Sequence, residues 1–446
     1  MNHSLEEAAN FQAVSPDKLL HRLREMFGED RARLLSGHRF RIASEASRVV
    51  AFPHDLHELS EIMKLAHDEH WRVIPAGAGT WLEMGNRPTK VNLIVSTKQM
   101  TRVVEYEPAD LTATVEAGCT LDAFNKRAAE HRQFIPLDPF GDSAMTIGGV
   151  IATASSGPSR CAYGTPRDWL IGLTVVHADG RITKAGGKVV KNVAGYDLCK
   201  LYTGSYGTLA VIAEMSFKLR ALPPREKTIV FYADAPDALC AMLAQITDSA
   251  VQPTAMELLS PSDALPLERN RFALALRFLN EAETVESQIE EAKKLGAEVQ
   301  HTVLSDGDAA AFWRAYRESE VSPAWGFSLR MTGLPADLPA MIADAGRILP
   351  RAFLRAHAGN GVLRIHAEEG WLDEVKSRLQ PRKIAELRRA AQSRGGQLLI
   401  LRAPAEITDQ LDVWGEAGAT AGLMRALKER FDPNALLNPG RFVAGI

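Results

Sequence analysis

Apolar residues near the start of the chain recur first with the period of a helix and then with the spacing of strands. Between residues 17 and 36 large apolar side chains lie three or four positions apart, and Ser15-Pro16 before them suits a cap and first turn. Residues 49–52 indicate a strand, residues 56–65 the apolar stripe of a helix, and residues 71–74 a second strand. This order predicts a lead-in helix followed by a strand-helix-strand unit.

Strands continue through the next part of the chain. Residues 91–118 alternate as three short strands separated by turns, and a helix is expected over residues 121–131 with Thr120 as its cap. Further strand-like runs occur at residues 173–176 and 209–212. These elements predict a sheet-rich domain.

The pattern changes after Pro223-Pro224, a pair that is typical of a domain boundary. Residues 227–430 combine helices with short strands, which predicts an α+β domain built on an antiparallel sheet. The chain then closes with FDPNALLNPGRF at residues 431–442.

Glycine and other small residues are dense between residues 139 and 219, above all at residues 146–157. Glycine is costly to order, so this density favours close approach of a ligand to the backbone, although a glycine-rich sheet without a ligand has the same composition. A second small-residue loop, residues 75–80, ends the strand-helix-strand unit and can point backbone N–H groups at an anion. Leu82 stands where a dinucleotide fingerprint needs its third glycine, and no Walker Gly-Lys follows.

Composition narrows the class of protein. A length of 446 residues with 46% hydrophobic residues predicts two or three globular domains. A net charge of -3 argues against electrostatic binding of nucleic acid. Neither a signal-peptide core nor an apolar run of membrane-spanning length is present, so we interpret the chain as cytoplasmic. The four cysteines form no C-x-x-C pair, and any iron-sulfur cluster is therefore expected on another subunit.

Several of these motifs together resemble a known family. Residues 49–80, TIGGVIATASSG at residues 146–157 and the stretch of residues 161–219 are similar to the FAD-binding domain of the vanillyl-alcohol oxidase and p-cresol methylhydroxylase type. The resemblance implies bound FAD and an α+β fold, in which a two-subdomain FAD-binding domain carries a second α+β domain. The expected parts are a helical lead-in (1–40), the FAD-binding domain (41–221), a cap or substrate domain (222–430) and a segment that returns to the FAD-binding domain (431–446).

The resemblance also implies which residues hold FAD. Two glycine-lined loops, near residues 77 and 148, are expected to hold opposite ends of one flavin dinucleotide. In the closing Asn-Pro-Gly turn, Asn438 and Arg441 are the candidates near the flavin. The expected cofactor-binding residues are Pro75, Ala76, Gly77, Ala78, Gly79, Thr80, Pro139, Gly141, Thr146, Gly148, Gly149, Ala152, Ser155, Gly157, Tyr163, Gly164, Gly207, Val211, Ile212 and Asn438.

A narrower resemblance rests on GPSRCAYGTPRDWLIG (157–172), on residues 186–212 and on the LNPGRF ending, which are similar to the smaller FAD-binding subunits, the E subunits, of bacterial glycolate oxidases. It implies oxidation of glycolate to glyoxylate, with hydride passing to flavin, in a complex with a larger FAD subunit and an iron-sulfur subunit. Such partners would also provide any contact with the inner membrane. Two alternatives remain open: a flavin-containing scaffold or electron-transfer subunit that turns nothing over, and a stand-alone dehydrogenase of another 2-hydroxy acid.

The substrate side departs from related 2-hydroxy-acid dehydrogenases, whose His-x-Gly-Asp-Gly-Asn-x-His motif helps bind a divalent metal. The matching residues 357–364 read HAGNGVLR, with Asn360 in place of the aspartate and Arg364 in place of the second histidine. His366 does not restore the spacing, because on a strand it shares a face with Arg364. One imidazole makes a poor metal site, so we predict no metal.

Three residues are candidates for substrate chemistry. Arg364 would hold a carboxylate through a bidentate pair, or be a surface or salt-bridged arginine in a subunit that has lost its own substrate site. Arg330 is a second carboxylate candidate, and His357 is either a base or a structural histidine. The basic run of residues 378–394 indicates a solvated helix face or a docking surface for an acidic partner.

Overall fold

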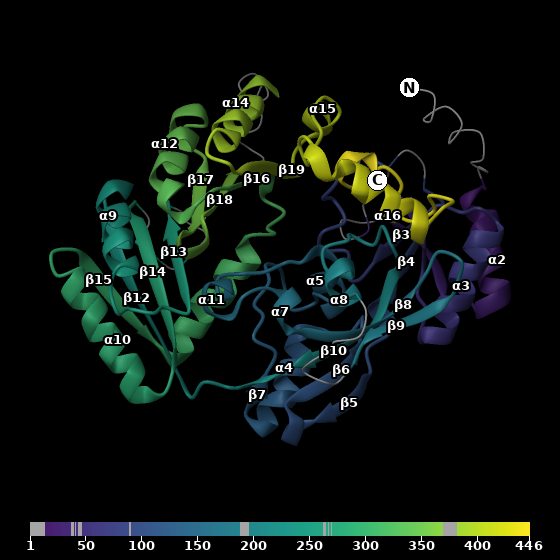
Figure 1. Cartoon of the computed structure of the whole chain (residues 1–446), viewed down its shortest axis with the longest axis horizontal. Coiled ribbons are helices and arrows are strands. Elements are labelled where there is room, and N and C mark those ends of the chain that lie inside the picture. Colours follow the sequence, from purple (N-terminus) through teal and green to yellow (C-terminus); the bar gives the residue numbers. More distant parts are fainter. Residues whose placement is uncertain are drawn as a thin grey trace.

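The computed structural model describes residues 14–36, 40, 42, 47–88, 91–187, 196–261, 265, 267–268, 270–368 and 381–446. Residues 188–195 of the glycine-rich stretch and Arg378 of the basic run lie outside the described residues. Two parts stand side by side in Figure 1: an N-terminal part that holds the smaller sheets, and a part built on a single eight-stranded sheet.

The first small sheet has the strand order β1-β2-β4-β3. Its elements are α2 (Pro16–Phe27), β1 (Ala32–Ser36), β2 (Ser47–Ala51), α3 (Leu56–Asp68), β3 (Val73–Ala76) and β4 (Leu93–Ser96). β2, β3 and β4 are parallel, and α3 supplies the crossover between β2 and β3 that a parallel arrangement requires. Ser15 and Asp55 cap α2 and α3, because each side-chain oxygen accepts a backbone N–H of the first turn.

The first helix is shorter than the sequence suggested. α2 ends at Phe27, where Gly28 adopts a φ of 105°, and residues 32–36 form β1. β1 pairs antiparallel with β2, and Ala32 is fully buried in the core behind this pair. The prediction of one helix over residues 17–36 is therefore wrong beyond Phe27, because strand pairing outweighs the helical spacing of the side chains there.

The second small sheet is antiparallel, with the order β5-β6-β10-β8-β9. Its strands are β5 (Val103–Glu107), β6 (Thr112–Glu116), β8 (Leu170–Val176), β9 (Ile182–Gly186) and β10 (Val211–Lys218). The other elements here are α4 (Leu121–Ala128), β7 (Gln133–Phe134), α5 (Ile147–Thr153), α6 (Arg160–Tyr163), α7 (Pro166–Trp169), α8 (Leu198–Tyr202) and β11 (Arg220–Ala221). The helix α5 was not predicted, because its two glycines are poor helix formers.

The eight-stranded sheet is antiparallel throughout, with the order β15-β12-β14-β13-β17-β18-β16-β19. Its strands are β12 (Arg225–Ala233), β13 (Ala255–Leu259), β14 (Phe272–Asn280), β15 (Gln300–Ser305), β16 (Trp325–Thr332), β17 (Phe353–His357), β18 (Val362–Glu368) and β19 (Gln397–Arg402). Its helices are α9 (Pro236–Thr247), α10 (Ala282–Leu295), α11 (Asp306–Ser319), α12 (Leu338–Ile348) and α14 (Pro381–Gln392). α11 packs on the face opposite to the other four, in a separate core cluster nearer the N-terminal part (Figure 1).

The last elements, α15 (Ala405–Thr408) and α16 (Ala421–Phe431), lead the chain back to the first sheet. Val73 N donates to Leu436 O at 2.7 Å, and Asn438 N donates to Val73 O at 2.9 Å, so the closing residues lie beside β3. The buried Lys428 Nζ donates to Thr208 O (2.8 Å) and Leu437 O (2.7 Å). These bonds fix the Asn-Pro-Gly turn against the loop before β10.

Candidate functional site

A cleft in the N-terminal part encloses an empty volume of about 920 Å³ that is open to solvent. Most residues that were expected to hold FAD line it: Pro75, Ala76, Gly77, Ala78, Gly79, Thr80, Thr146, Gly148, Gly149, Ala152, Gly207, Val211, Ile212 and Asn438. The loop after β3, the start of α5, the loop before β10 and the closing turn therefore converge on one site.

The two glycine-lined loops touch each other. A Cβ atom on Gly77 would collide with Thr146 Oγ1, the atom that accepts a hydrogen bond from Gly149 N and caps α5. At Gly148 a Cβ would lie only 2.7 Å from the Cβ of Ala117. The loops thus lie side by side and not at opposite ends of the cleft, and part of their glycine content is required by packing within the chain.

Six expected residues stand outside the lining of the cleft: Pro139, Gly141, Ser155, Gly157, Tyr163 and Gly164. Gly157 is required by the chain, because a Cβ there would collide with the carbonyl oxygen of Asp138. Gly164, at a φ of 77°, ends α6 beside Asp168. Tyr163 lines a separate cavity between the two parts of the molecule. The structure therefore divides the glycine-rich stretch between ligand-facing and purely structural positions.

Besides Trp81, three aromatic side chains that were not among the expected residues also line the cleft, Tyr206, Trp414 and Phe442. The ring centroids are 4.9 Å apart for Tyr206 and Trp414 and 5.0 Å apart for Trp414 and Phe442, so the rings form one wall. Tyr206 has a φ of 53°, and its carbonyl accepts a hydrogen bond from Asn438 Nδ2. The turn residues around Tyr206 were a usable signal, whereas Trp414 has no local motif that marks it.

Arg441 supplies a positive charge to the cleft. Its Nη2 donates to the carbonyl oxygens of Leu82 and Met84, both at 2.6 Å, and its Nη1 to Asn438 Oδ1 at 3.4 Å. Burial lowers the pKa of Arg441 to about 10, so the side chain stays charged at neutral pH. Within the described ranges no carboxylate pairs with it. A buried cation without a counter-ion favours an anionic ligand.

Other buried polar atoms at the cleft also lack a hydrogen-bond partner among the residues that the structure describes. They are Thr80 Oγ1, Trp81 Nε1 and Arg441 Nε. Buried polar groups are nearly always paired in native proteins. Together with the close-packed backbone of the two loops, these atoms suit a long ligand that combines a pyrophosphate anion with polar rings, and FAD meets this description.

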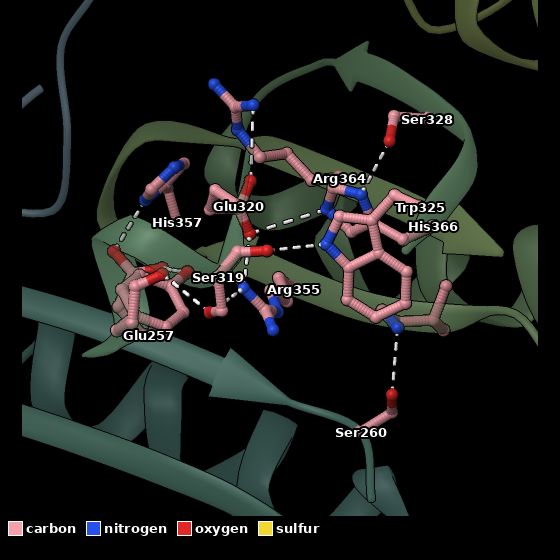
Figure 2. A network of polar contacts seen from close by, with 12 residues as sticks. Glu257, Ser260, Ser319, Glu320, Trp325, Ser328, Arg355, His357, Arg364 and His366 are labelled. Atoms are coloured by element: carbon pink, nitrogen blue, oxygen red, sulfur yellow. Dashed lines mark hydrogen bonds and ion pairs between the residues drawn. The ribbon is translucent and has the colours of Figure 1, made fainter. Parts of the chain in front are cut away.

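A row of arginines crosses the eight-stranded sheet, and two of them, Arg355 and Arg364, are labelled in Figure 2. In the strand register Arg330 of β16 stands opposite Arg364 of β18, which in turn stands opposite Arg355 of β17. Glu320, directly after α11, lies 2.9 Å from Arg355 Nη1 and 3.2 Å from Arg364 Nη1. Two of the three neighbouring arginines thus share one close carboxylate.

Glu320 is also the centre of a wider buried network (Figure 2). His366 Nε2 lies 3.4 Å from Glu320 Oε1, on the same strand face as Arg364, as the alternation of side chains predicts. Ser328 Oγ lies 2.9 Å from His366 Nδ1. Burial alone would raise the pKa of Glu320, but His366, Arg355 and Arg364 together hold it well below its ordinary value. Glu320 is therefore an anion at neutral pH, and its role was not visible in the sequence.

Arg330 differs from the other two arginines. Its Nε is buried without a hydrogen bond, and no carboxylate within the described residues pairs with it. Burial lowers the pKa of Arg330, the nearby Tyr206 opposes this shift, and repulsion by Arg364 adds to it. Because Tyr206 lines the cleft, the unpaired guanidinium of Arg330 lies next to the cleft wall.

His357 belongs to a second polar group. Its Nδ1 lies 2.5 Å from Glu257 Oε1, and Tyr316 Oη donates to Glu257 Oε2 at 2.7 Å. Burial raises the pKa of Glu257, although His357 opposes the shift. His357 Nε2 makes no hydrogen bond with any described residue. This contact is typical of an imidazole whose tautomer is fixed with Nε2 free to accept a proton.

The three candidate substrate residues are not part of the cleft lining, but two of them lie close to it. Arg330 and Arg364 both act on the pKa of Tyr206, which is raised by burial and lowered by the two arginines. His357 contacts Phe140, which does not line the cleft itself. No group of three or more His, Cys, Asp or Glu side chains in the described residues is arranged to hold a metal ion. A helix with the length and hydropathy of a membrane span is likewise not found in the described ranges.

The fold and the cleft define a flavin-dinucleotide-binding oxidoreductase. Residues 47–186 match the model of the FAD binding domain, and residues 414–442 match that of the C-terminal domain of FAD linked oxidases. A solved structure of 4-ethylphenol oxidase from Gulosibacter chungangensis superposes with a TM-score of 0.70, at 15% identity, over 97% of this chain and 98% of that one. The likeness of the two structures shows a shared fold.

Curated relatives identify the family. The glycolate oxidase subunit GlcD of Bacillus subtilis (strain 168) is 30% identical over 421 residues, which cover 89% of this chain and 88% of that protein. The D-2-hydroxyglutarate dehydrogenase of Xanthomonas citri pv. viticola is 27% identical over 425 residues, 88% of each chain. The chain therefore belongs to the FAD-linked oxidases and its cofactor is FAD. The predicted α+β fold and the predicted cofactor are both confirmed.

Proposed function

We propose that this chain is the FAD-binding subunit of a multi-subunit glycolate, or 2-hydroxy-acid, oxidase. Its partners in the proposal are a larger FAD subunit and an iron-sulfur subunit, in a cytoplasmic complex that partner subunits can hold at the inner membrane. The similarity to GlcD over most of both chains supports a glycolate-oxidase type of complex. The motifs at residues 157–172 and 186–212 support assignment to the E-type subunit.

The observation that carries the substrate class is the excess of positive charge beside the cleft. Arg330, Arg355 and Arg364 occupy adjacent register positions, and Glu320 offsets only part of their charge. Unpaired buried charges are costly, so this arrangement favours an anionic ligand. A 2-hydroxy acid supplies a carboxylate that a guanidinium binds through two parallel hydrogen bonds. Arg330 has its full charge available for such a pair, whereas Glu320 offsets part of the charge of Arg364.

A 2-hydroxy acid also needs a proton acceptor for its hydroxyl group. In the proposed site Arg330 and Arg364 hold the carboxylate, while His357 Nε2 accepts the hydroxyl proton as hydride leaves the α-carbon. Glu257 stabilises the resulting imidazolium through Nδ1, at 2.5 Å. When bound in the cleft, flavin supplies the hydride acceptor. The glycine-lined loops and Arg441 would hold it there, and the wall of Tyr206, Trp414 and Phe442 would exclude water.

One observation favours a second candidate, a flavin-containing scaffold that turns nothing over. Arg355 and Arg364 are tied to Glu320, and none of the three candidate substrate residues lines the cleft. A purely structural network would show the same contacts. The two candidates therefore differ in whether Arg330 and His357 ever meet a substrate.

The test is anaerobic mixing of the FAD-loaded chain with glycolate, first alone and then with its native partner subunits. Loss of flavin absorbance near 450 nm on glycolate addition supports the enzyme, and loss only with the partners supports a catalytic subunit of a complex. Absence of bleaching in both preparations, while FAD stays bound, supports the scaffold. A count of flavin and iron in the complex purified from the native host checks the proposed partners.

A further inference from the structure

Phe140 belongs to the N-terminal part, but its side chain is buried in the core of the other part. The ring is completely inaccessible and packs in a cluster with Val230, Tyr316 and other residues of the eight-stranded part. Trp81, which lines the FAD cleft, packs against the same cluster. The loop that carries Phe140 therefore fills the space between the cleft and the polar groups of the eight-stranded sheet.

The ring of Phe140 contacts both groups to which the proposed mechanism assigns substrate chemistry. The guanidinium carbon of Arg364 lies 4.2 Å from the ring centroid, and the ring of His357 lies 5.2 Å from it, centroid to centroid. A substrate that places its carboxylate near Arg364 and its hydroxyl group near His357 has its α-carbon beside this ring. Any further substituent on the α-carbon would then compete with Phe140 for space.

Contacts made by Phe140 and by the residue that follows it hold the ring in place. Gly141 has a φ of 143°, and a Cβ there would collide with Met145 Sδ. Gly141 N donates to Arg317 O of α11 at 3.2 Å, and Phe140 meets Tyr316 edge to face at 6.1 Å. A ring that is fixed by a turn open only to glycine, a backbone hydrogen bond and a buried aromatic partner does not move aside at low cost.

We propose that Phe140 is a specificity-determining residue, which restricts the site to 2-hydroxy acids with hydrogen or, at most, a methyl group on the α-carbon. This inference rests on the proposed function and narrows its substrate class: glycolate is accepted, whereas 2-hydroxy acids with branched or long side chains are excluded. Close packing supports such selectivity, since one methylene group in a fitted apolar pocket changes kcat/KM by roughly 10- to 200-fold.

The experiment compares wild type with Phe140→Val, each loaded with FAD and assembled with the native partners. The measured quantity is the ratio of kcat/KM for glycolate to kcat/KM for 2-hydroxy-4-methylpentanoate, from the rate of anaerobic flavin bleaching. We expect the ratio to fall at least about tenfold in Phe140→Val, because the smaller side chain admits the branched substituent. Phe140→Leu, which keeps more of the volume, should give an intermediate ratio and serves if the valine variant does not fold.

Phe312→Val is the matched control. Phe312 is as deeply buried in the same cluster and packs against Trp313 and Tyr316, whereas its ring contacts include neither Arg364 nor His357. In Phe312→Val the ratio of kcat/KM for glycolate to kcat/KM for 2-hydroxy-4-methylpentanoate should equal that of wild type. If wild type is bleached by glycolate and a folded, flavin-loaded Phe140 variant keeps the wild-type ratio, Phe140 does not set specificity and the proposed function stands. If no 2-hydroxy acid bleaches wild type with its partners, the proposed function fails, and the inference fails with it.

Discussion

The FAD cleft and the arginine row on the eight-stranded sheet are neighbouring sites built in opposite ways. In the cleft the chain offers mainly backbone, and Gly77 and Gly148 are required where two loops meet Thr146 and Ala117. On the sheet it offers long ionised side chains that stand opposite one another on three strands. A backbone cradle depends on local conformation, whereas the arginine row depends on the pairing of distant strands.

The difference extends to energetics. A larger side chain in the cleft should weaken FAD binding, because the glycine loops form the walls of the cleft. Changing a charge on the sheet acts first on stability, since Glu320 is fully buried among cations and each member of the network depends on its partners. Substitutions in the cleft should therefore mainly weaken FAD binding, whereas substitutions on the sheet should mainly lower the free energy of unfolding.

In the cleft the largest expected effect is on FAD binding. In Gly77→Val the new side chain collides with Thr146 Oγ1 and displaces one loop from the other. Overpacking of this kind costs about 1–3 kcal/mol, and a cost of this size borne by the FAD-bound state corresponds to roughly 5- to 150-fold weaker FAD binding. Titration of the apoprotein with FAD, followed by flavin fluorescence, measures the change. Gly187→Ala is the control, because no atom lies within 4 Å of a Cβ at this position, and unchanged affinity in Gly77→Val would contradict the contact.

On the sheet the largest expected loss is in folding stability. Glu320→Gln leaves Arg355 and Arg364 without their shared anion, and removal of one partner from a buried ion pair costs about 3–5 kcal/mol. Chemical denaturation at neutral pH measures this free energy of unfolding. Arg347→Met, which breaks only ion pairs of an exposed arginine, should leave the free energy of unfolding nearly unchanged.

The same glutamate predicts how stability depends on pH. The pKa of Glu320 is held well below its ordinary value of 4.5. A depressed carboxyl pKa contributes stability that is present above pH 4.5 and is lost as the pH falls through the folded-state pKa. The free energy of unfolding of wild type should therefore decrease below about pH 4.5. In Glu320→Gln the decrease should be weaker, and an equal decrease in both proteins would assign the acid sensitivity to other groups.

Local signals predicted the cleft and failed at the arginine row. Small residues at 75–80 and 146–149 mark the loops without any knowledge of the fold, although the helix α5 was missed because glycines obscure it. Arg364 was a candidate only through its place in a resembling motif. Glu320 was not a candidate, because a single glutamate after a helix has no distinctive sequence pattern and its partners lie on separate strands.

The end of the first helix and the position of Phe140 were also not predictable from local sequence. The predicted first helix extended too far because the pairing of residues 32–36 with β2 is a long-range contact. Phe140 reads as an ordinary loop residue, and only the packing of the two parts shows that its ring enters the core of the eight-stranded part. Properties that depend on one segment were predictable, whereas those that depend on contact between distant segments were not.

Arg330 and Arg355 provide a sharper comparison within the row itself. Arg355 pairs with Glu320, so Arg355→Met should destabilise the fold by about 3–5 kcal/mol. Arg330 has no carboxylate partner within the described residues and stands opposite Arg364, so Arg330→Met should raise the free energy of unfolding by about 0.2–1 kcal/mol through relief of like-charge repulsion. The same Arg330→Met substitution should weaken glycolate binding by at least about 2 kcal/mol. Denaturation and glycolate titration of both variants measure these changes, and a destabilised Arg330→Met that still binds glycolate would make Arg330 structural.

The smallest expected effect is that of metal removal. The segment that resembles a metal-binding motif has Asn360 and Arg364 where carboxylate and imidazole ligands would stand, and a guanidinium cannot donate a lone pair to a cation. His357 directs Nδ1 to Glu257, which leaves a single free ring nitrogen there. Dialysis against a chelator should therefore leave the rate of glycolate-dependent bleaching unchanged, and added zinc or manganese should not increase it. A rate that falls on chelation and returns with a divalent metal would show that a cation, rather than the arginine row, binds the substrate carboxylate.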